Sequence, residues 1–91
     1  MPKFVIEREI PGAGSLSSAQ LEEISKTSVA TLSGMDGRAQ WLHSFVTDDK
    51  IFCVYIADDV AAVQEHATKG GFPCNQINTV RTIIDPTTAG V

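Results

Sequence analysis

The chain has 91 residues, of which 43% are hydrophobic and 20% charged, and its formal net charge is −4. This composition is typical of a folded chain and excludes a disordered one, and the length suffices for one small domain over residues 1–91. The acidic balance argues against nucleic acid or an anionic membrane as partner, whereas a cation or a neutral small molecule fits better. So small a core stabilises a fold only marginally, so we expect support from a second copy or a metal.

The sequence lacks the motifs of a membrane span, a signal peptide and a zinc or disulfide framework. No apolar segment reaches the roughly 20 residues that span a bilayer, and MPKFVIEREI at the N-terminus lacks the apolar core of a signal peptide. We therefore expect a cytoplasmic protein without membrane contact. Two cysteines, Cys53 and Cys74, are too few for a disulfide framework and form no Cys-x-x-Cys zinc motif. Cys53 lies in an apolar run and is expected to be a buried thiol.

The first third of the chain predicts a strand followed by a helix. The segment KFVIEREI, residues 3–10, alternates in polarity and places Glu7 on the face opposite Arg8. Ser17 and Gln20 fit a capping box at the start of a helix. A thin apolar stripe, diluted by serine and threonine, continues this helix at spacings of three and four: Leu21, Ile24, Ser28, Leu32 and Met35.

Two apolar segments, residues 39–47 and 50–57, are separated by Asp48-Asp49 and predict a β-hairpin. If Thr47 pairs with Lys50, alternation places one set of residues on one face: Trp41, His43, Phe45, Phe52, Val54 and Ile56. The opposite face then holds another set: Leu42, Ser44, Val46, Ile51, Cys53 and Tyr55. Both sets are largely apolar, and an apolar sheet face of this size is rarely left in water.

The remaining sequence predicts a second helix and a fourth strand. Asp58 or Asp59 caps a helix over residues 60–69, and Gly70-Gly71 followed by Pro73 ends it. Residues 76–84 form a strand, and residues 85–91 form a tail. The order β-α-β-β-α-β is the split βαβ, or ferredoxin-like, α+β pattern, with both helices on one face of an antiparallel sheet. The bare face predicts that two copies pack sheet on sheet as a twofold homodimer.

Several segments carry a resemblance to a known family. The run LHSFVTDDKIFCVYIA, then EHATKGGFP and IIDPTT, resembles a group of small bacterial proteins classed as a domain of unknown function. The resemblance extends from KFVIEREIPGAG to the DPTTA tail. It implies a ferredoxin-like fold, a homodimer, and nickel or another divalent transition metal as ligand. More distantly, the fold is similar to the dimeric α/β barrels, which include cofactor-free monooxygenases and muconolactone-isomerase-like enzymes.

The candidate metal ligands are His43, His66 and Glu7. The chain has only two histidines, and nickel accepts imidazole and carboxylate ligands. His66 lies at the edge of the apolar stripe of its helix, and Glu7 lies within a strand, where carboxylates are uncommon. If the face that carries His43 meets the helices, the two imidazoles share one cavity. The alternative is that each histidine is a boundary residue with one hydrogen bond.

Two other functions remain open. In the first, a small enzyme of the isomerase, cyclase or monooxygenase kind acts without a cofactor on a hydrophobic molecule held between sheet and helices. His66 or His43 would be the general acid or base, and Tyr55 or Glu7 would orient the substrate. In the second, the protein is an interaction module that uses only its dimer surface. We interpret Cys53 and Tyr55 as packing residues at that interface, with a polar pocket as the alternative.

Overall fold

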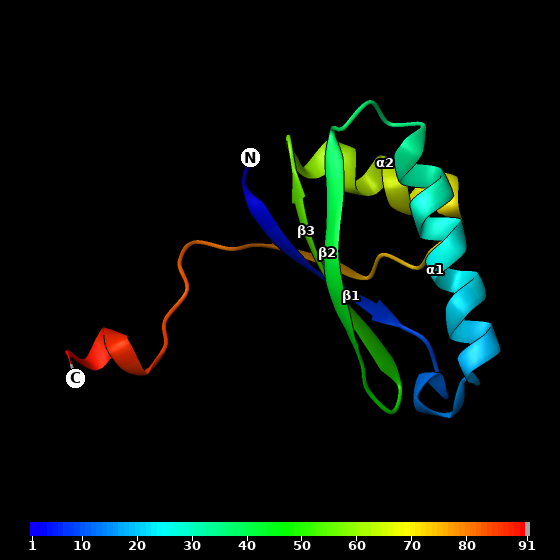
Figure 1. Ribbon diagram of the computed structural model, residues 1–91, viewed down its shortest axis with the longest axis horizontal. Coiled ribbons are helices and arrows are strands. Elements are labelled where there is room, and N and C mark those ends of the chain that lie inside the picture. The colour runs from blue at the N-terminus through cyan, green and yellow to red at the C-terminus, as the bar shows by residue number, and fades with distance from the viewer. Residues whose placement is uncertain (91) are drawn as a thin grey trace.

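The computed structural model describes residues 1–90, in which two helices cover one face of a four-stranded sheet (Figure 1). The strands are β1 (Lys3–Glu9), β2 (Ala39–Val46), β3 (Lys50–Ala57) and β4 (Gln76–Thr79), and the helices are α1 (Ser18–Ser33) and α2 (Val60–Gly70). The sheet order is β2-β3-β1-β4, and every neighbouring pair is antiparallel. The predicted element order β-α-β-β-α-β is confirmed.

The helix ends follow the local sequence. Ser17 Oγ accepts the Gln20 backbone N–H at 3.1 Å, and Gln20 Oε1 accepts the Ser17 N–H at 2.8 Å, which is the predicted capping box. Asp59, rather than Asp58, caps α2, because its Oδ1 accepts the Ala62 N–H at 2.9 Å. Gly71 has a φ of 72°, a left-handed conformation that favours glycine and ends α2.

A β-bulge in β2 changes which residues face the helices. Trp41 lies opposite Tyr55, whereas His43 lies opposite Val54, so the register shifts by one residue at Leu42. Trp41 therefore shares the helix-covered face with Tyr55, and His43 points to the open face. The prediction that Trp41 and His43 share a face is wrong because simple alternation does not count the bulged residue.

The fourth strand is shorter than predicted, because it ends at Thr79 and not at residue 84. The last bond to β1 runs from the Val80 N–H to the Lys3 carbonyl at 2.9 Å. Beyond Lys3 the neighbouring chain is Pro2, which has no N–H to continue the ladder. Residues 80–90, here called the arm, leave the body of the molecule (Figure 1). Val91, the end of the predicted tail, lies outside the described residues.

The arm makes the molecule less compact than its length implies. The radius of gyration is 14.1 Å, whereas a compact chain of this length has one of roughly 12 Å. The arm carries Ile83 and Ile84, whose side chains are 68% and 75% exposed. Within residues 1–90, no helix is both long enough and apolar enough to cross a bilayer.

The core lies mainly between the sheet and α2. Its largest fully buried side chains are those of Phe4, Ile6, Met35, Val63 and His66. In contrast, α1 buries only Ser28 completely, and the apolar residues of its stripe between residues 21 and 32 stay half-buried. The serines of α1 are too small to fill the space beneath this helix, so the core is incomplete there.

Candidate functional site

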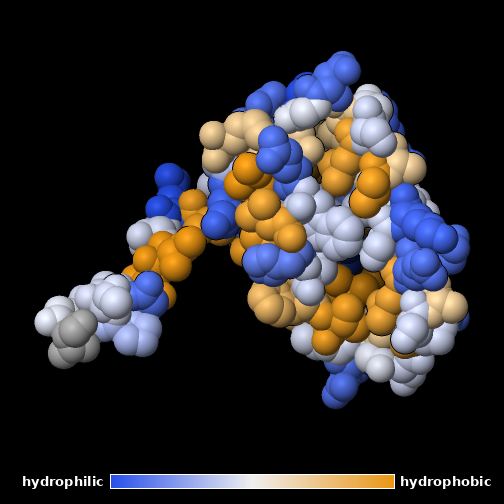
Figure 2. All heavy atoms as spheres, viewed as in Figure 1, coloured by the Kyte–Doolittle hydropathy of each residue, from blue (hydrophilic) through white to orange (hydrophobic). Residues whose placement is uncertain are grey.

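A cavity of about 540 Å³ lies between α1 and the sheet. Residues from α1, β1, β2, β3 and the loop after α2 form its wall, and they are mostly apolar: Ile10, Leu21, Ile24, Trp41, Val46, Ile51 and Phe72. Figure 2 shows the hollow between the hairpin strands and α1, with hydrophobic side chains around it. A cavity of this size and character is typical of sites for small organic molecules.

Arg8 contributes a buried positive charge to the wall of this cavity. The residue is only 2% exposed and lines the cavity. Its Nε donates to Cys53 Sγ at 3.3 Å and its Nη1 donates to the Pro73 carbonyl at 2.6 Å, while Nη2 has no partner among the described residues. Among residues 1–90, no carboxylate forms an ion pair with Arg8. An uncompensated buried charge is costly, so its presence calls for a reason beyond packing.

His66 lies directly behind the cavity wall. Its side chain is 1% exposed, its Nε2 lies 3.1 Å from Ser28 Oγ, and its Nδ1 has no partner within residues 1–90. Burial and, to a lesser degree, the charge of Arg8 lower the pKa of His66 to about 4. The imidazole is therefore neutral at pH 7. Because Ser28 lines the cavity, its hydroxyl connects the imidazole to the enclosed space.

Tyr55 lies between these two groups. It is 3% exposed and lines the cavity, its ring centroid lies 5.0 Å from that of His66, and the Arg8 guanidinium lies 6.0 Å from its ring. Burial raises the pKa of the Tyr55 hydroxyl above its ordinary value. The phenol therefore stays protonated at neutral pH and is able to donate a hydrogen bond into the cavity.

The segment Gly70-Gly71-Phe72-Pro73 forms part of the cavity wall. The Phe72 ring lies 5.4 Å from the Arg8 guanidinium and 5.4 Å from the His66 ring. A side chain at Gly70 would collide with this ring, so glycine there lets Phe72 fold back over α2. The glycine pair thus ends the helix and positions the aromatic ring that covers the two buried nitrogen-containing side chains.

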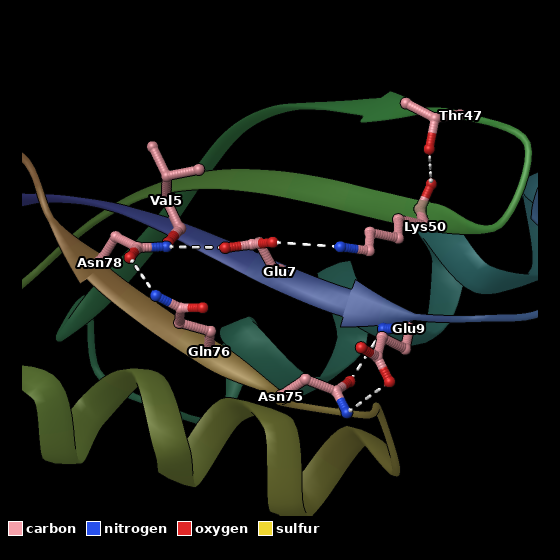
Figure 3. Close-up of polar contacts among 8 residues, drawn as sticks. All are labelled: Val5, Glu7, Glu9, Thr47, Lys50, Asn75, Gln76 and Asn78. Carbon is pink, nitrogen blue, oxygen red and sulfur yellow. Dashed lines mark hydrogen bonds and ion pairs between the residues drawn. The ribbon is translucent and has the colours of Figure 1, made fainter.

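The open face of the sheet holds a different polar cluster, drawn in Figure 3. Glu7 Oε1 lies 3.5 Å from Lys50 Nζ, and Glu7 Oε2 accepts from Asn78 Nδ2 at 3.4 Å, which links β3, β1 and β4 (Figure 3). His43 is exposed on this same face of β2, and its ring contacts the Phe45 ring edge-on at 5.1 Å.

The predicted metal ligands are therefore divided between two faces. His66 lies beneath α2, whereas His43 and Glu7 lie on the open face, with β3 between their strands, and two strand spacings amount to roughly 10 Å. Within residues 1–90, no group of three His, Cys, Asp or Glu side chains converges on a possible metal position. One copy of the chain thus does not supply a complete metal site from these residues.

The buried thiol predicted for Cys53 is confirmed, and Cys74 is exposed. Cys53 and Tyr55 face the helices, so the interpretation that they line an interface between sheets is wrong. They line the largely apolar cavity instead, and His43 lies outside it. Arg8 and Ser28 were not predicted as site residues. The sequence does carry one indication of Arg8, because this charged residue lies on the same strand face as the apolar Phe4 and Ile6.

No curated protein matches the chain. The fold is similar to that of the crystal structure of SCO4226 from Streptomyces coelicolor A3(2), with a TM-score of 0.75. The two chains are 18% identical in sequence, and the match covers 90% of this chain and 99% of that one. At this identity, the likeness shows a shared fold. A family model described as "Nickel responsive protein SCO4226-like" matches residues 4–80, and the chain therefore belongs to the SCO4226-like family.

Proposed function

We propose that the protein is a ferredoxin-like homodimer that binds nickel between the open sheet faces of its two copies. Membership of a family described as nickel responsive is the observation that carries this proposal. The acidic net charge of −4 also favours a cationic ligand.

The open face supports the homodimer. It presents an apolar group next to the polar cluster: Val5, Phe45, Phe52, Val54 and Ile56. Phe45 is 59% exposed in one copy, and large exposed aromatic side chains favour an interface. The arm adds Ile83 and Ile84, which stay largely exposed in one copy. In this proposal the arm packs against the partner and extends the interface.

His43 and Glu7 supply the donors on the open face. A twofold arrangement presents each of them twice, which provides the three or more ligands that a single copy lacks. Nickel binding would draw Glu7 away from Lys50, whose ion pair with it spans 3.5 Å. His66 is not a ligand in this proposal, because it is buried on the opposite side of the sheet.

Calorimetric titration with Ni²⁺ tests the metal site. We expect saturable binding to the wild-type protein and at least tenfold weaker binding to His43→Ala and to Glu7→Gln. Glu22→Gln is the matched control, because this carboxylate is 64% exposed on α1, away from the open face. Unchanged affinity in both open-face variants, or no binding to the wild-type protein, would contradict the proposal.

The cavity supports a second candidate, a cofactor-free enzyme that moves a proton on a small apolar substrate. The Tyr55 hydroxyl would orient the substrate, and Ser28 would relay a proton to the neutral His66 at 3.1 Å. A test is deuterium exchange into a panel of small ketones and lactones in heavy water, followed by proton NMR. Wild-type protein should accelerate exchange in at least one compound and His66→Gln should not. Equal rates with and without protein across the panel would remove this candidate.

A further inference from the structure

We infer that the cavity beneath α1 binds an apolar monocarboxylic acid, with the carboxylate paired to Arg8. The nickel proposal is not required for this, because the cavity lies on the other face of the sheet. The inference does name a ligand class for the second candidate function. Its test measures binding alone, so acid binding supports the inference whichever way the exchange experiment on the enzyme comes out.

The first argument is the unbalanced charge of Arg8. A guanidinium stays protonated under all ordinary conditions, and here only a thiol and a carbonyl accept its hydrogen bonds. The remaining nitrogen, Nη2, is buried without a partner in the part of the chain that the structure describes. Buried polar groups are almost always satisfied in folded proteins, and an exception points to an absent ion or ligand. A carboxylate in the cavity would supply both the missing charge and the missing acceptor.

The second argument is the character of the space beside Arg8. Apart from this charged end, most of the lining is apolar, with Leu21 and Ile24 of α1 facing Trp41 and Ile51 of the sheet. About 540 Å³ accommodates an aliphatic or aromatic tail. Ser28 and Tyr55 lie at the polar end and are able to donate to the second carboxylate oxygen.

The charge count argues for a monoanion. Arg8 is the only cationic side chain among the lining residues, so a phosphate ester or a dicarboxylate would bring a second charge without a partner. The one acidic lining residue, Glu23, lies at the outer rim with its side chain 76% exposed. It disfavours a ligand that is charged at both ends. The cavity thus selects an anionic ligand, although the acidic net charge of the whole chain favours a cationic one.

The only tryptophan of the chain, Trp41, lines the cavity, so its fluorescence reports occupancy directly. We would titrate wild-type protein with octanoate and 3-phenylpropionate, and in parallel with octanamide and 3-phenylpropanamide. At least one acid should give a saturable change and bind at least tenfold more tightly than its amide, since hydrogen bonds to charged groups are the stronger ones. Equal affinity for acid and amide, or no binding of either acid, would overturn the inference.

Two variants test separately the charge of Arg8 and the free volume of the cavity. Arg8→Met keeps an unbranched, though shorter, side chain and removes the charge, so acid and amide should bind equally. Ser25→Phe places a ring in the cavity without touching Arg8 and should weaken acid binding at least tenfold, whereas Ser33→Phe on the exposed side of the same helix should leave it unchanged. If Arg8→Met does not fold, the comparison of Ser25→Phe with Ser33→Phe still decides. Acid binding that survives Ser25→Phe unchanged would place the acid outside the cavity and contradict the inference.

Discussion

His66 Nε2 and Ser28 Oγ lie 3.1 Å apart and join α2 to α1 in the interior of the protein. Both residues are buried, at 1% and 4% exposure, and this is where α1 comes closest to the core. The contact therefore holds one wall of the cavity in place and gives the imidazole its only hydrogen-bond partner among residues 1–90.

Replacing Ser28 with alanine should destabilise the fold. The change leaves both imidazole nitrogens buried without a partner, which costs about 1–3 kcal/mol in the free energy of unfolding. Urea denaturation measures this cost. Ser25→Ala is the matched control, because the Ser25 hydroxyl bonds only to the Leu21 carbonyl of its own helix and alanine is the better helix former. Equal stability of the two variants would contradict this role of Ser28.

The stability of the protein should rise with pH between about 4 and 6.5. Burial, aided by the charge of Arg8, lowers the pKa of His66 from 6.5 to about 4 in the folded protein. Within this window the unfolded chain binds a proton that the folded one does not, so unfolding is favoured as the pH falls. The full effect is on the order of 3 kcal/mol, and it is present above pH 6.5 and lost by pH 4.

Urea denaturation at several pH values checks this dependence, with His66→Gln as comparison. The variant should lack this part of the pH dependence. The half-buried carboxylate of Glu65, whose pKa is lowered to about 2 by Arg38 and Lys69, affects stability mainly below pH 4.5 and is common to both proteins. Parallel curves for wild type and variant between pH 4.5 and 6.5 would show that His66 is not buried as a neutral group.

Gly70→Ala should disturb the wall of the cavity. The added methyl group would meet the Phe72 ring closely, and overpacking of this kind costs about 1–3 kcal/mol. The change should also alter Trp41 fluorescence, because Phe72 and Trp41 line the same space. Gly34→Ala is the control, since its nearest neighbour is the Thr31 carbonyl oxygen at an ordinary 3.6 Å. If both variants are as stable as wild type, Phe72 does not occupy this position.

Removing the apolar side chains of the arm should weaken self-association. The double variant Ile83→Ser with Ile84→Ser takes away two exposed side chains, each worth about 1.5 kcal/mol or more if buried by a partner. Sedimentation velocity should show at least a tenfold rise in the dissociation constant of the dimer. Val29→Ser on α1 removes a side chain that is 57% exposed elsewhere and should have no effect. An arm variant that dimerises like wild type would place the interface elsewhere.

Local sequence signals predicted most of the fold. The capping box at Ser17, the cap at Asp59 and the left-handed Gly71 all act within a few residues, and each fixes a helix end. The end of β4 depends instead on its neighbour, because pairing ceases where β1 begins at Lys3. The bulge at Leu42 likewise depends on how β2 pairs with β3, and the polar–apolar alternation of the β2 sequence does not reveal it.

The candidate site was predicted only in part, because its contacts join distant segments. Ser28 and His66 are 38 residues apart, and Arg8 and Pro73 are 65 apart. His66 was expected as a metal ligand or a general acid or base, and Tyr55 as a site residue only in the enzyme alternative, whereas Arg8 looked like one polar residue on an otherwise apolar strand face. Only the folded arrangement reveals that its charge has no counter-ion within residues 1–90.

Native mass spectrometry with added Ni²⁺ tests the central proposal most directly, because it reports chain number and bound metal in one measurement. We predict a species of twice 9.8 kDa that carries nickel, and a His43→Ala dimer without it. Nickel bound to a single copy of the chain, or a wild-type dimer that stays free of nickel, would contradict the account.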